Sequence, residues 1–72
     1  MTPLRTLVIP SAMYKLYKHS NQFGQAEYII KMHPKAGKGD NYEFRGTTVF
    51  MAEAGEFGEG KIAADAFLDS KV

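Results

Sequence analysis

Residues 25–33 are QAEYIIKMH, and this stretch decides the fold because apolar and polar side chains alternate along it. A period of two is typical of a β-strand with one buried face. The apolar face carries Ala26, Tyr28, Ile30 and Met32. The polar face carries Gln25, Glu27, Lys31 and His33, with Ile29 as an apolar exception. Pro34 lacks a backbone donor and is expected to end the strand.

The strand pattern resumes after a turn. Residues 35–41, KAGKGDN, supply the glycines, Asp and Asn that are typical of a chain reversal. Residues 41–51, NYEFRGTTVFM, then place on one face Tyr42, Phe44, Thr48 and Phe50, and on the other Glu43, Arg45, Thr47 and Val49. Gly46 interrupts the alternation and indicates a bulge. We expect the two strands to form a hairpin.

The N-terminal segment predicts an edge strand. Residues 6–9, TLVI, are short and β-branched, and Pro10 stops them. Their apolar core is too short for a signal peptide, and no run approaches the ~18 apolar residues of a membrane span. We therefore expect a protein of the cytoplasm, or of a host cytoplasm, with no membrane partner.

Residues 11–25, SAMYKLYKHSNQFGQ, fit two structures. In a short helix, Ser11 would be the cap and one face would carry Met13, Leu16 and Tyr17. In a strand, Tyr14 and Leu16 would point one way, and Lys15 and Tyr17 the other. The tyrosines and the turn signal SNQFG favour the strand without excluding the helix.

A short helix is predicted at the C-terminus, over residues 61–70, KIAADAFLDS. Its polar stripe is spaced i, i+4, i+8 and comprises Lys61, Asp65 and Asp69. A helix of about ten residues does not persist alone, so it must dock on the sheet through Ile62, Ala66 and Phe67 or their neighbours. The expected fold is a single compact α+β domain over residues 1–72, with an antiparallel sheet of three or four strands and this helix on one face.

Composition fits one small globular domain. The chain has 72 residues, no cysteine and a formal net charge of +1. The small net charge hides an asymmetry, because residues 1–45 carry seven basic and three acidic residues, whereas residues 46–72 carry two basic and five acidic ones. Such a dipole can orient a charged partner.

The stretch GEFGEGK, residues 55–61, matches the G-x-x-x-x-G-K frame of a phosphate-binding loop. Ile62 stands where the magnesium-binding hydroxyl is required, and Glu56 and Glu59 would repel a phosphate. The chain is also too short for the parallel sheet that presents such a loop. We predict no nucleotide cofactor and interpret the stretch as a connector, with glycines at positive φ and Phe57 folded back as an anchor.

Residues 14–19, YKLYKH, combine cations for phosphate with rings for stacking, as a nucleic-acid-binding face does. Further basic residues lie on or near an adjoining edge. The candidate binding residues are Tyr14, Lys15, Tyr17, Lys18, Lys31, Lys35, Lys38 and Arg45. The alternative interpretation is an ordinary strand with packed tyrosines and solvated lysines.

From Tyr42 onward, YEFRGTTVFMAEAGEFGEGKIAADAFL resembles the C-terminal half of a double-stranded-RNA-binding domain, in which strands lead through a Gly-rich turn into a helix. That family places a lysine cluster at the helix start, across the RNA backbone. Only Lys61 matches this cluster, and acidic residues stand at Asp65 and Asp69. The resemblance covers less than half of the chain, which we do not assign to the family.

No catalytic or metal-binding pattern is present. His19 and His33 have no metal-ligand spacing, and the serines lie outside any nucleophile-elbow motif. The nine aromatic residues exceed the need of a thin core and favour an interface, with Tyr17, Ile29 and Val49 as an exposed patch. We expect a small non-enzymatic protein that binds another protein, as a regulator, inhibitor or assembly subunit of the kind that bacteriophages encode. A homodimer is one form of this hypothesis, and nucleic-acid binding is the alternative.

Overall fold

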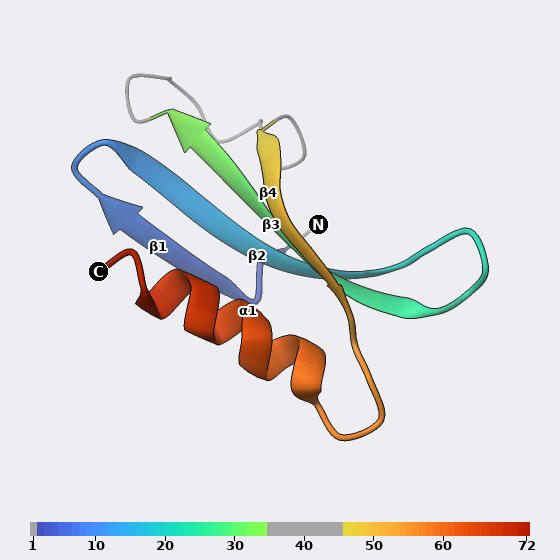
Figure 1. Cartoon of the computed structure of the whole chain (residues 1–72). Coiled ribbons are helices and arrows are strands. Elements are labelled where there is room, and N and C mark those ends of the chain that lie inside the picture. The colour runs from blue at the N-terminus through green and yellow to red at the C-terminus, as the bar shows by residue number, and fades with distance from the viewer. Residues whose placement is uncertain (1, 35–45) are drawn as a thin grey trace.

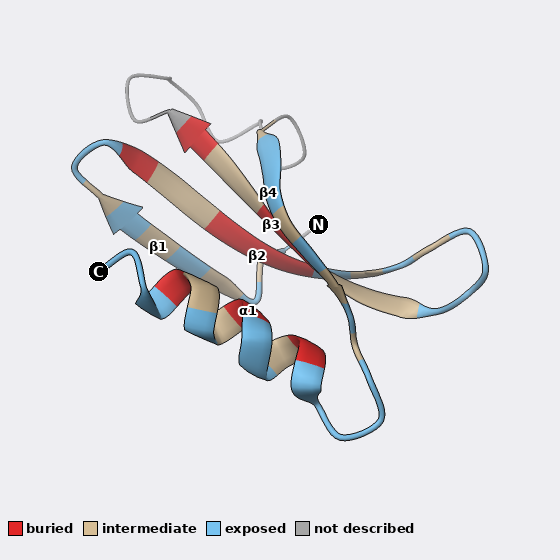
Figure 2. Cartoon of the chain, in the orientation of Figure 1, coloured by how far each residue is buried: buried red, intermediate tan, exposed pale blue. Residues whose placement is uncertain are grey.

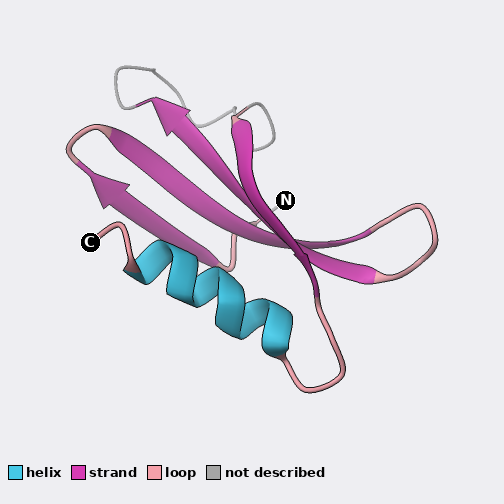
Figure 3. Ribbon diagram, viewed as in Figure 1, coloured by secondary structure: helices cyan, strands magenta, loops and turns pink. Residues whose placement is uncertain are grey.

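A computed structural model describes residues 2–34 and 46–72 of the chain. It contains a four-stranded antiparallel sheet followed by one helix, as Figures 1 and 3 show. The elements are β1 (Arg5–Ile9), β2 (Ala12–Ser20), β3 (Ala26–Pro34), β4 (Thr47–Glu53) and α1 (Glu59–Asp69). The predicted α+β fold is confirmed.

The sheet is a meander in which each strand pairs with the next along the chain, so β1 and β4 are its edges. β2 and β3 pair along nine residues each, from Ala12 opposite Pro34 to Ser20 opposite Ala26. The turn between them is held by Asn21, whose Oδ1 accepts the backbone N–H groups of Phe23 and Gln25. The strand interpretation of residues 12–20 is confirmed. The long pairing with β3 supplies hydrogen-bond partners for the backbone of this segment.

β4 contains a bulge that the sequence did not predict, whereas the bulge predicted at Gly46 borders residues 35–45, which lie outside the described residues. Ile30 pairs with Phe50, but the next residue, Lys31, pairs with Thr48, which leaves Val49 as the extra residue in β4. Register partners share a sheet face. The expectation that Thr48 and Phe50 share a face is therefore wrong, because the bulge at Val49 shifts the alternation by one residue.

The helix docks on the sheet through a different set of residues from the predicted one. Its buried residues are spaced i, i+4, i+8 and comprise Gly60, Ala64 and Leu68. Ile62 and Ala66 are exposed, so the prediction was wrong for them, whereas Phe67 is half-buried and packs on Phe50. The reason is close approach, because a Cβ atom at Gly60 would overlap the backbone carbonyl oxygen of Glu53.

The core lies between α1 and the facing side of the sheet (Figure 2). Its centre comprises Leu16, Ile30, Ala64 and Leu68. Five partly buried apolar residues pack against this centre: Leu7, Tyr14, Tyr28, Phe50 and Phe67. Every strand thus contributes a side chain, and the one helix closes the layer.

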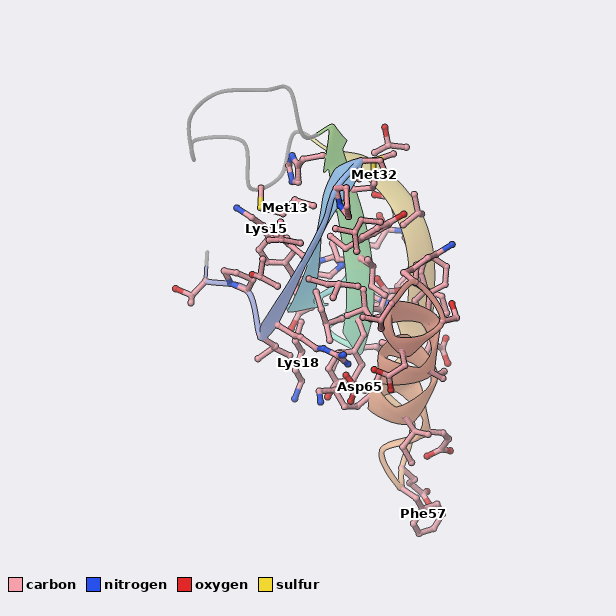
Figure 4. The ribbon with its side chains drawn as sticks, turned by 90° about the vertical axis from the view of Figure 1, so that its left-hand side faces the viewer. Met13, Lys15, Lys18, Met32, Phe57 and Asp65 are labelled. Carbon is pink, nitrogen blue, oxygen red and sulfur yellow. The ribbon has the colours of Figure 1, made fainter. Side chains whose placement is uncertain are left out.

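The segment between β4 and α1 is a connector, as its glycines predicted. Gly55 and Gly58 have φ of 79° and 80°, in the left-handed region that other residues rarely adopt. The expectation that Phe57 anchors this loop is wrong, because its side chain is 84% exposed and points away from the molecule (Figure 4). The loop is stabilised instead by Glu59, whose Oε1 accepts the Phe57 backbone N–H at 2.7 Å.

Candidate interaction surface

The two sides of the sheet differ in what covers them. Figure 4 shows α1 on one side and Met13 and Lys15 directed to the other. We call this second side the open face because α1 does not cover it, although Lys15, Tyr17, Ile29 and His33 at its centre are buried. From the strand registers, its residues are Thr6, Val8, Met13, Lys15, Tyr17, His19, Glu27, Ile29, Lys31, His33, Thr48, Met51 and Glu53. It includes most of the polar face that the sequence predicted for β3.

The predicted exposed patch of Tyr17, Ile29 and Val49 is wrong for two of its three residues. Tyr17 and Ile29 pair opposite each other and both are buried, whereas Val49 is exposed. An alternating pattern predicts only one buried face of a strand, so it did not predict the burial of Tyr17 and Ile29 on the side away from the helix. The exposed apolar residues of the open face are Val8 on β1 and Met51 on β4, at 54% and 58% exposure.

The tyrosines of the candidate set are packed. Tyr14 lies on the helix side, where its ring meets the edge of Phe67 with centroids 6.4 Å apart. Tyr17 lies on the open face and is fully buried. Base stacking needs an exposed ring face. Neither tyrosine offers one in this structure.

The basic residues of the candidate set divide between the two sides. Lys18 is exposed on the helix side, with its Nζ 5.8 Å from the centroid of the Tyr28 ring. Lys15 and Lys31 lie on the open face, directly opposite each other in the β2–β3 register. The remaining predicted residues, Lys35, Lys38 and Arg45, lie outside the described residues. Among the basic candidates that the structure describes, it therefore brings together only Lys15 and Lys31.

His33 lies beside this lysine pair. It is buried, and its ring is so close to Gly46 that an added Cβ atom there would lie 2.8 Å from the His33 Cε1. Burial, followed by the charges of Lys15 and Lys31, lowers the pKa of His33 below its usual 6.5. The imidazole is therefore neutral at neutral pH, and its buried Nε2 has no hydrogen-bond partner within the described ranges.

The opposite end of the open face carries acidic groups. His19 Nε2 lies 3.3 Å from the Glu27 carboxylate, which also accepts a hydrogen bond from the Asn21 side chain. Glu53 of β4 pairs opposite Glu27 in the register. The face is thus basic where β2 and β3 carry their lysines and acidic near the β2–β3 turn.

A cluster of ion pairs on the helix side was missed by the sequence analysis. Arg5 of β1 binds Asp65 at 2.9 Å and Asp69 at 2.7 Å. The Lys61 ammonium binds Asp65 at 2.8 Å, and both cations lower the pKa of the Asp65 carboxyl. The stripe of Lys61, Asp65 and Asp69 was predicted, but Arg5 is sixty positions from Asp65 and no local pattern links them.

The geometry of the GEFGEGK loop fits a connector. The Glu59 carboxylate already accepts a loop N–H of the kind that would hold a phosphate oxygen, and Lys61 is paired with Asp65. Within residues 2–34 and 46–72, no three His, Asp or Glu side chains converge as metal ligands. The same residues contain no helix that is long and apolar enough to cross a membrane.

The chain was compared with known proteins at three levels. No protein-family model matches it, and neither a curated protein nor a solved structure is significantly similar to it.

Proposed function

We propose that this chain is a small non-enzymatic interaction protein that binds another protein, as a regulator, an inhibitor or an assembly subunit. The observation that carries the proposal is the open face. It keeps Val8 and Met51 exposed on the two edge strands, on either side of the Lys15–Lys31 pair. Protein interfaces combine exposed apolar side chains with polar and charged groups, which lie mainly at the rim.

The edge strands support the same proposal. β4 is seven residues long, five of its residues are exposed, and no lysine or proline interrupts it. Natural edge strands usually carry such residues because they prevent unwanted pairing. An edge without them can accept a strand from a partner, including the same strand of a second copy in a homodimer.

Nucleic-acid binding is the second candidate function, because Lys15 and Lys31 lie opposite each other in the β2–β3 register and would be its two phosphate contacts. Lys18, on the other side of the sheet, would have to contact a different part of the nucleic acid. Two contacts predict a log–log salt slope of only about −1.8 on duplex DNA. The buried Tyr17 and packed Tyr14 weigh against this candidate, since neither can stack with a base.

The test is affinity capture by the tagged chain from nuclease-treated lysate of its source cells, followed by mass spectrometry. The matched variants are Met51→Glu on the open face and Ile62→Glu on the outer side of α1, since both residues are exposed. We expect one protein to be captured by the wild type and by Ile62→Glu but lost with Met51→Glu.

Two results would contradict the proposal. One is the absence of any protein that the wild type captures and an unrelated tagged domain does not. The other is capture of RNA or DNA alone from lysate without nuclease, with a labelled oligonucleotide binding that Lys15→Gln and Lys31→Gln weaken together.

A further inference from the structure

We propose that Phe57 and Phe23 are aromatic anchors, and that they insert into apolar pockets of a partner protein whose surface around those pockets is basic. This inference rests on the proposed function and specifies the contact surface and the chemistry of the partner. We call this surface the turn end. It comprises Phe23 in the β2–β3 turn, Phe57 in the β4–α1 connector, and the nearby Glu53, Glu56 and Glu59.

The turn and the connector lie at the same end of the sheet. β4 runs antiparallel to β3, so Glu53 near the end of β4 is opposite Glu27 near the start of β3. The next residue, Ala54, donates its N–H to the carbonyl oxygen of Ala26 at 3.0 Å, and Ala26 is the first residue of β3 after the turn. Figure 1 shows the β2–β3 turn and the β4–α1 connector projecting from this end. Both phenylalanines therefore border one surface.

Both phenylalanine side chains are exposed, although phenylalanine is among the residues most often buried. Phe57 is 84% exposed and Phe23 is 75% exposed. Apart from the C-terminal Val72, no other large apolar residue of the described part is exposed to this degree. Aromatic rings bring a large apolar area into a contact and dominate the energetics of many interfaces. Each ring thus offers most of its area to a partner.

The connector holds Phe57 in a defined conformation. Its backbone N–H donates to Glu59 Oε1 at 2.7 Å, and the flanking glycines, Gly55 and Gly58, have φ of 79° and 80°. The Glu59 carboxylate also fills the space beside Gly55, where an added Cβ atom would lie 2.7 Å from the Glu59 Cδ. A loop that is fixed in this way loses less conformational entropy on binding than a flexible loop does. Phe57 is therefore preorganised as an anchor.

The β2–β3 turn repeats this arrangement at Phe23. The Phe23 backbone N–H donates to Asn21 Oδ1 at 2.8 Å, and Gly24 follows directly with φ of 78°. The same Asn21 oxygen accepts the Gln25 N–H, which closes the turn. In both turns a side-chain oxygen two residues away binds the N–H of the phenylalanine, and a left-handed glycine follows the ring. Two turns with the same geometry at one end of the sheet favour a shared contact surface over two unrelated exposed rings.

The charges at the turn end favour a basic partner. Glu53 and Glu56 are exposed and form no ion pair with any residue of the described ranges. The ammonium of Lys61, just after the connector, is bound by Asp65 at 2.8 Å. Lys18, the other described lysine near this end, lies on the helix side with its Nζ over an aromatic ring. Lysine or arginine side chains around a partner's pocket would pair with the free carboxylates at the rim of the contact, where interface charges usually lie.

A protein fits the turn end better than a nucleic acid or a membrane does. An exposed ring can also stack on a base or enter a lipid layer. Glu53, Glu56 and Glu59 lie on the same surface, however, and their charge repels the phosphate groups of a nucleic acid or of an anionic lipid. A protein pocket with a basic rim supplies both the apolar contact and the opposite charge.

The first test uses the full chain and a small pocket of the proposed chemistry. Amino-substituted β-cyclodextrin has an apolar cavity with a cationic rim, and neutral β-cyclodextrin is the ligand control. The whole chain has a formal charge of +1, so only the local charge of the turn end favours the cationic ligand. In an NMR titration at low salt, we expect the amino form to shift the Phe57 and Phe23 ring signals and to bind at least about tenfold more tightly, with an advantage that salt reduces. Equal affinity of the two ligands, or shifts elsewhere only, would overturn the proposal.

The matched protein variants are Phe57→Ala and Ile62→Ala, because both remove an exposed apolar side chain, one from the connector and one from the outer side of α1. Phe57→Ala should weaken binding of the amino-substituted cyclodextrin at least about tenfold, and Ile62→Ala should leave its affinity within about twofold. Glu56→Gln should weaken the amino form and leave the neutral form unchanged. Equal effects of Phe57→Ala and Ile62→Ala would overturn the assignment of the anchor.

The second test identifies the partner's surface. The photo-crosslinking residue p-benzoylphenylalanine is placed at position 57, 23, 51 or 62 of the tagged full chain, which is irradiated in lysate of its source cells. Mass spectrometry then locates the crosslinked peptides. We expect positions 57 and 23 to crosslink to one protein, at apolar segments flanked by lysine or arginine, and Phe57→Ala to reduce its capture at least about tenfold.

This inference can fail while the proposed function stands. Crosslinks from position 51 or 62 without positions 57 and 23 would leave a protein-binding chain and overturn the turn end as its contact surface. Crosslinks from only one of the two phenylalanines, or to a second copy of this chain, would overturn the proposal too. So would tighter binding of a labelled oligonucleotide, or of vesicles containing anionic lipid, than of the amino-substituted cyclodextrin. No protein crosslink from any of the four positions would contradict the proposed function as well.

Discussion

Gly60 is the residue at which the helix meets the backbone of the sheet edge. Its N–H donates to the Ala54 carbonyl at 3.0 Å, and an added Cβ would overlap the Glu53 carbonyl oxygen and lie 2.9 Å from the Ala54 Cα. Both neighbours are backbone atoms, which cannot move aside as a flexible side chain can. The position therefore requires glycine although it lies in the first turn of a helix.

Gly60→Ala should accordingly destabilise the protein. Helix propensity alone would make alanine about 1 kcal/mol more favourable. The overlap should outweigh this gain and lower the free energy of unfolding by about 1–3 kcal/mol or more, as overpacking does. Urea denaturation measures the change.

The control for Gly60→Ala is Gly24→Ala. Gly24 has φ of 78°, and a Cβ there would meet nothing within 4 Å. Its cost should be only the left-handed strain of about 1–2 kcal/mol. A Gly60→Ala protein more stable than the wild type would show that the helix does not approach the β4 end as closely as described.

His33 should make stability depend on pH in the weakly acidic range. Its folded pKa lies below the usual 6.5, so the unfolded chain binds the proton more readily than the folded one. Stability should therefore be complete above about pH 6.5 and fall as the pH drops from there through the folded pKa. Urea midpoints measured from about pH 7.5 to about pH 5 follow this loss.

His33→Gln should remove most of that slope and leave a flatter profile above about pH 5. An unchanged slope in this variant would assign the pH dependence to another group. The lowered pKa of Asp65 affects stability in a separate, more acidic pH range. The stability that the Asp65 carboxylate contributes is complete above about pH 3.8 and is lost as the pH falls through the pKa of the folded state.

At the scale of elements, α1 is held on the sheet by one narrow stripe of buried residues, Gly60, Ala64 and Leu68. Leu68 is fully buried in the core, whereas Ile62 is 67% exposed on the outer side. Leu68→Ala should lower the free energy of unfolding by about 2–5 kcal/mol, and Ile62→Ala by less than about 0.5 kcal/mol. Thermal melts of the two variants test the orientation of the helix. Similar losses in both would mean that the helix is rotated about its axis relative to this description.

The ion pairs between β1 and α1 should contribute less to the stability of the fold than Leu68 does, and their contribution should depend on salt. Asp65→Asn removes the carboxylate that binds both Arg5 and Lys61. We expect a lower melting temperature in low salt, a smaller loss than that of Leu68→Ala, and a difference from the wild type that shrinks in concentrated salt. Glu56→Gln is the matched control, since Glu56 is exposed and forms no ion pair within the described part of the chain. A loss that salt does not reduce would indicate a packing role for Asp65.

At the scale of the whole molecule, sheet and helix should fold only together. The helix spans eleven residues, and its buried face is completed by Leu16 and Ile30 of the central strands. Isolated helices of this length are marginal in water. A peptide of residues 55–72 should therefore show little helicity by circular dichroism. A chain ending at residue 54 should lack a cooperative melt, because its core side is left uncovered. A cooperative melt of that truncated chain would show a self-sufficient sheet.

The sequence by itself determined the kind and order of the elements. The alternation in residues 25–33, the turn at SNQFG and the Gly-rich connector before the last segment each report a local backbone preference. Local preferences are enough to predict strands, a hairpin and a C-terminal helix, and the structure has all of these. The same patterns favoured the strand for residues 12–20, where the long pairing with β3 excludes the helix.

Only the tertiary structure decided which side chains face which partner. Residues 62–68 are apolar nearly all round, so periodicity could not select Gly60, Ala64 and Leu68 over Ile62 and Ala66. The selection follows from how closely the helix can approach a strand end, which depends on residues far apart in the sequence. The burial of Tyr17, the bulge at Val49 and the pairing of Arg5 with the helix have the same origin. Each depends on contacts between distant segments of the chain. The energy of such contacts cannot be inferred from the pattern of neighbouring residues.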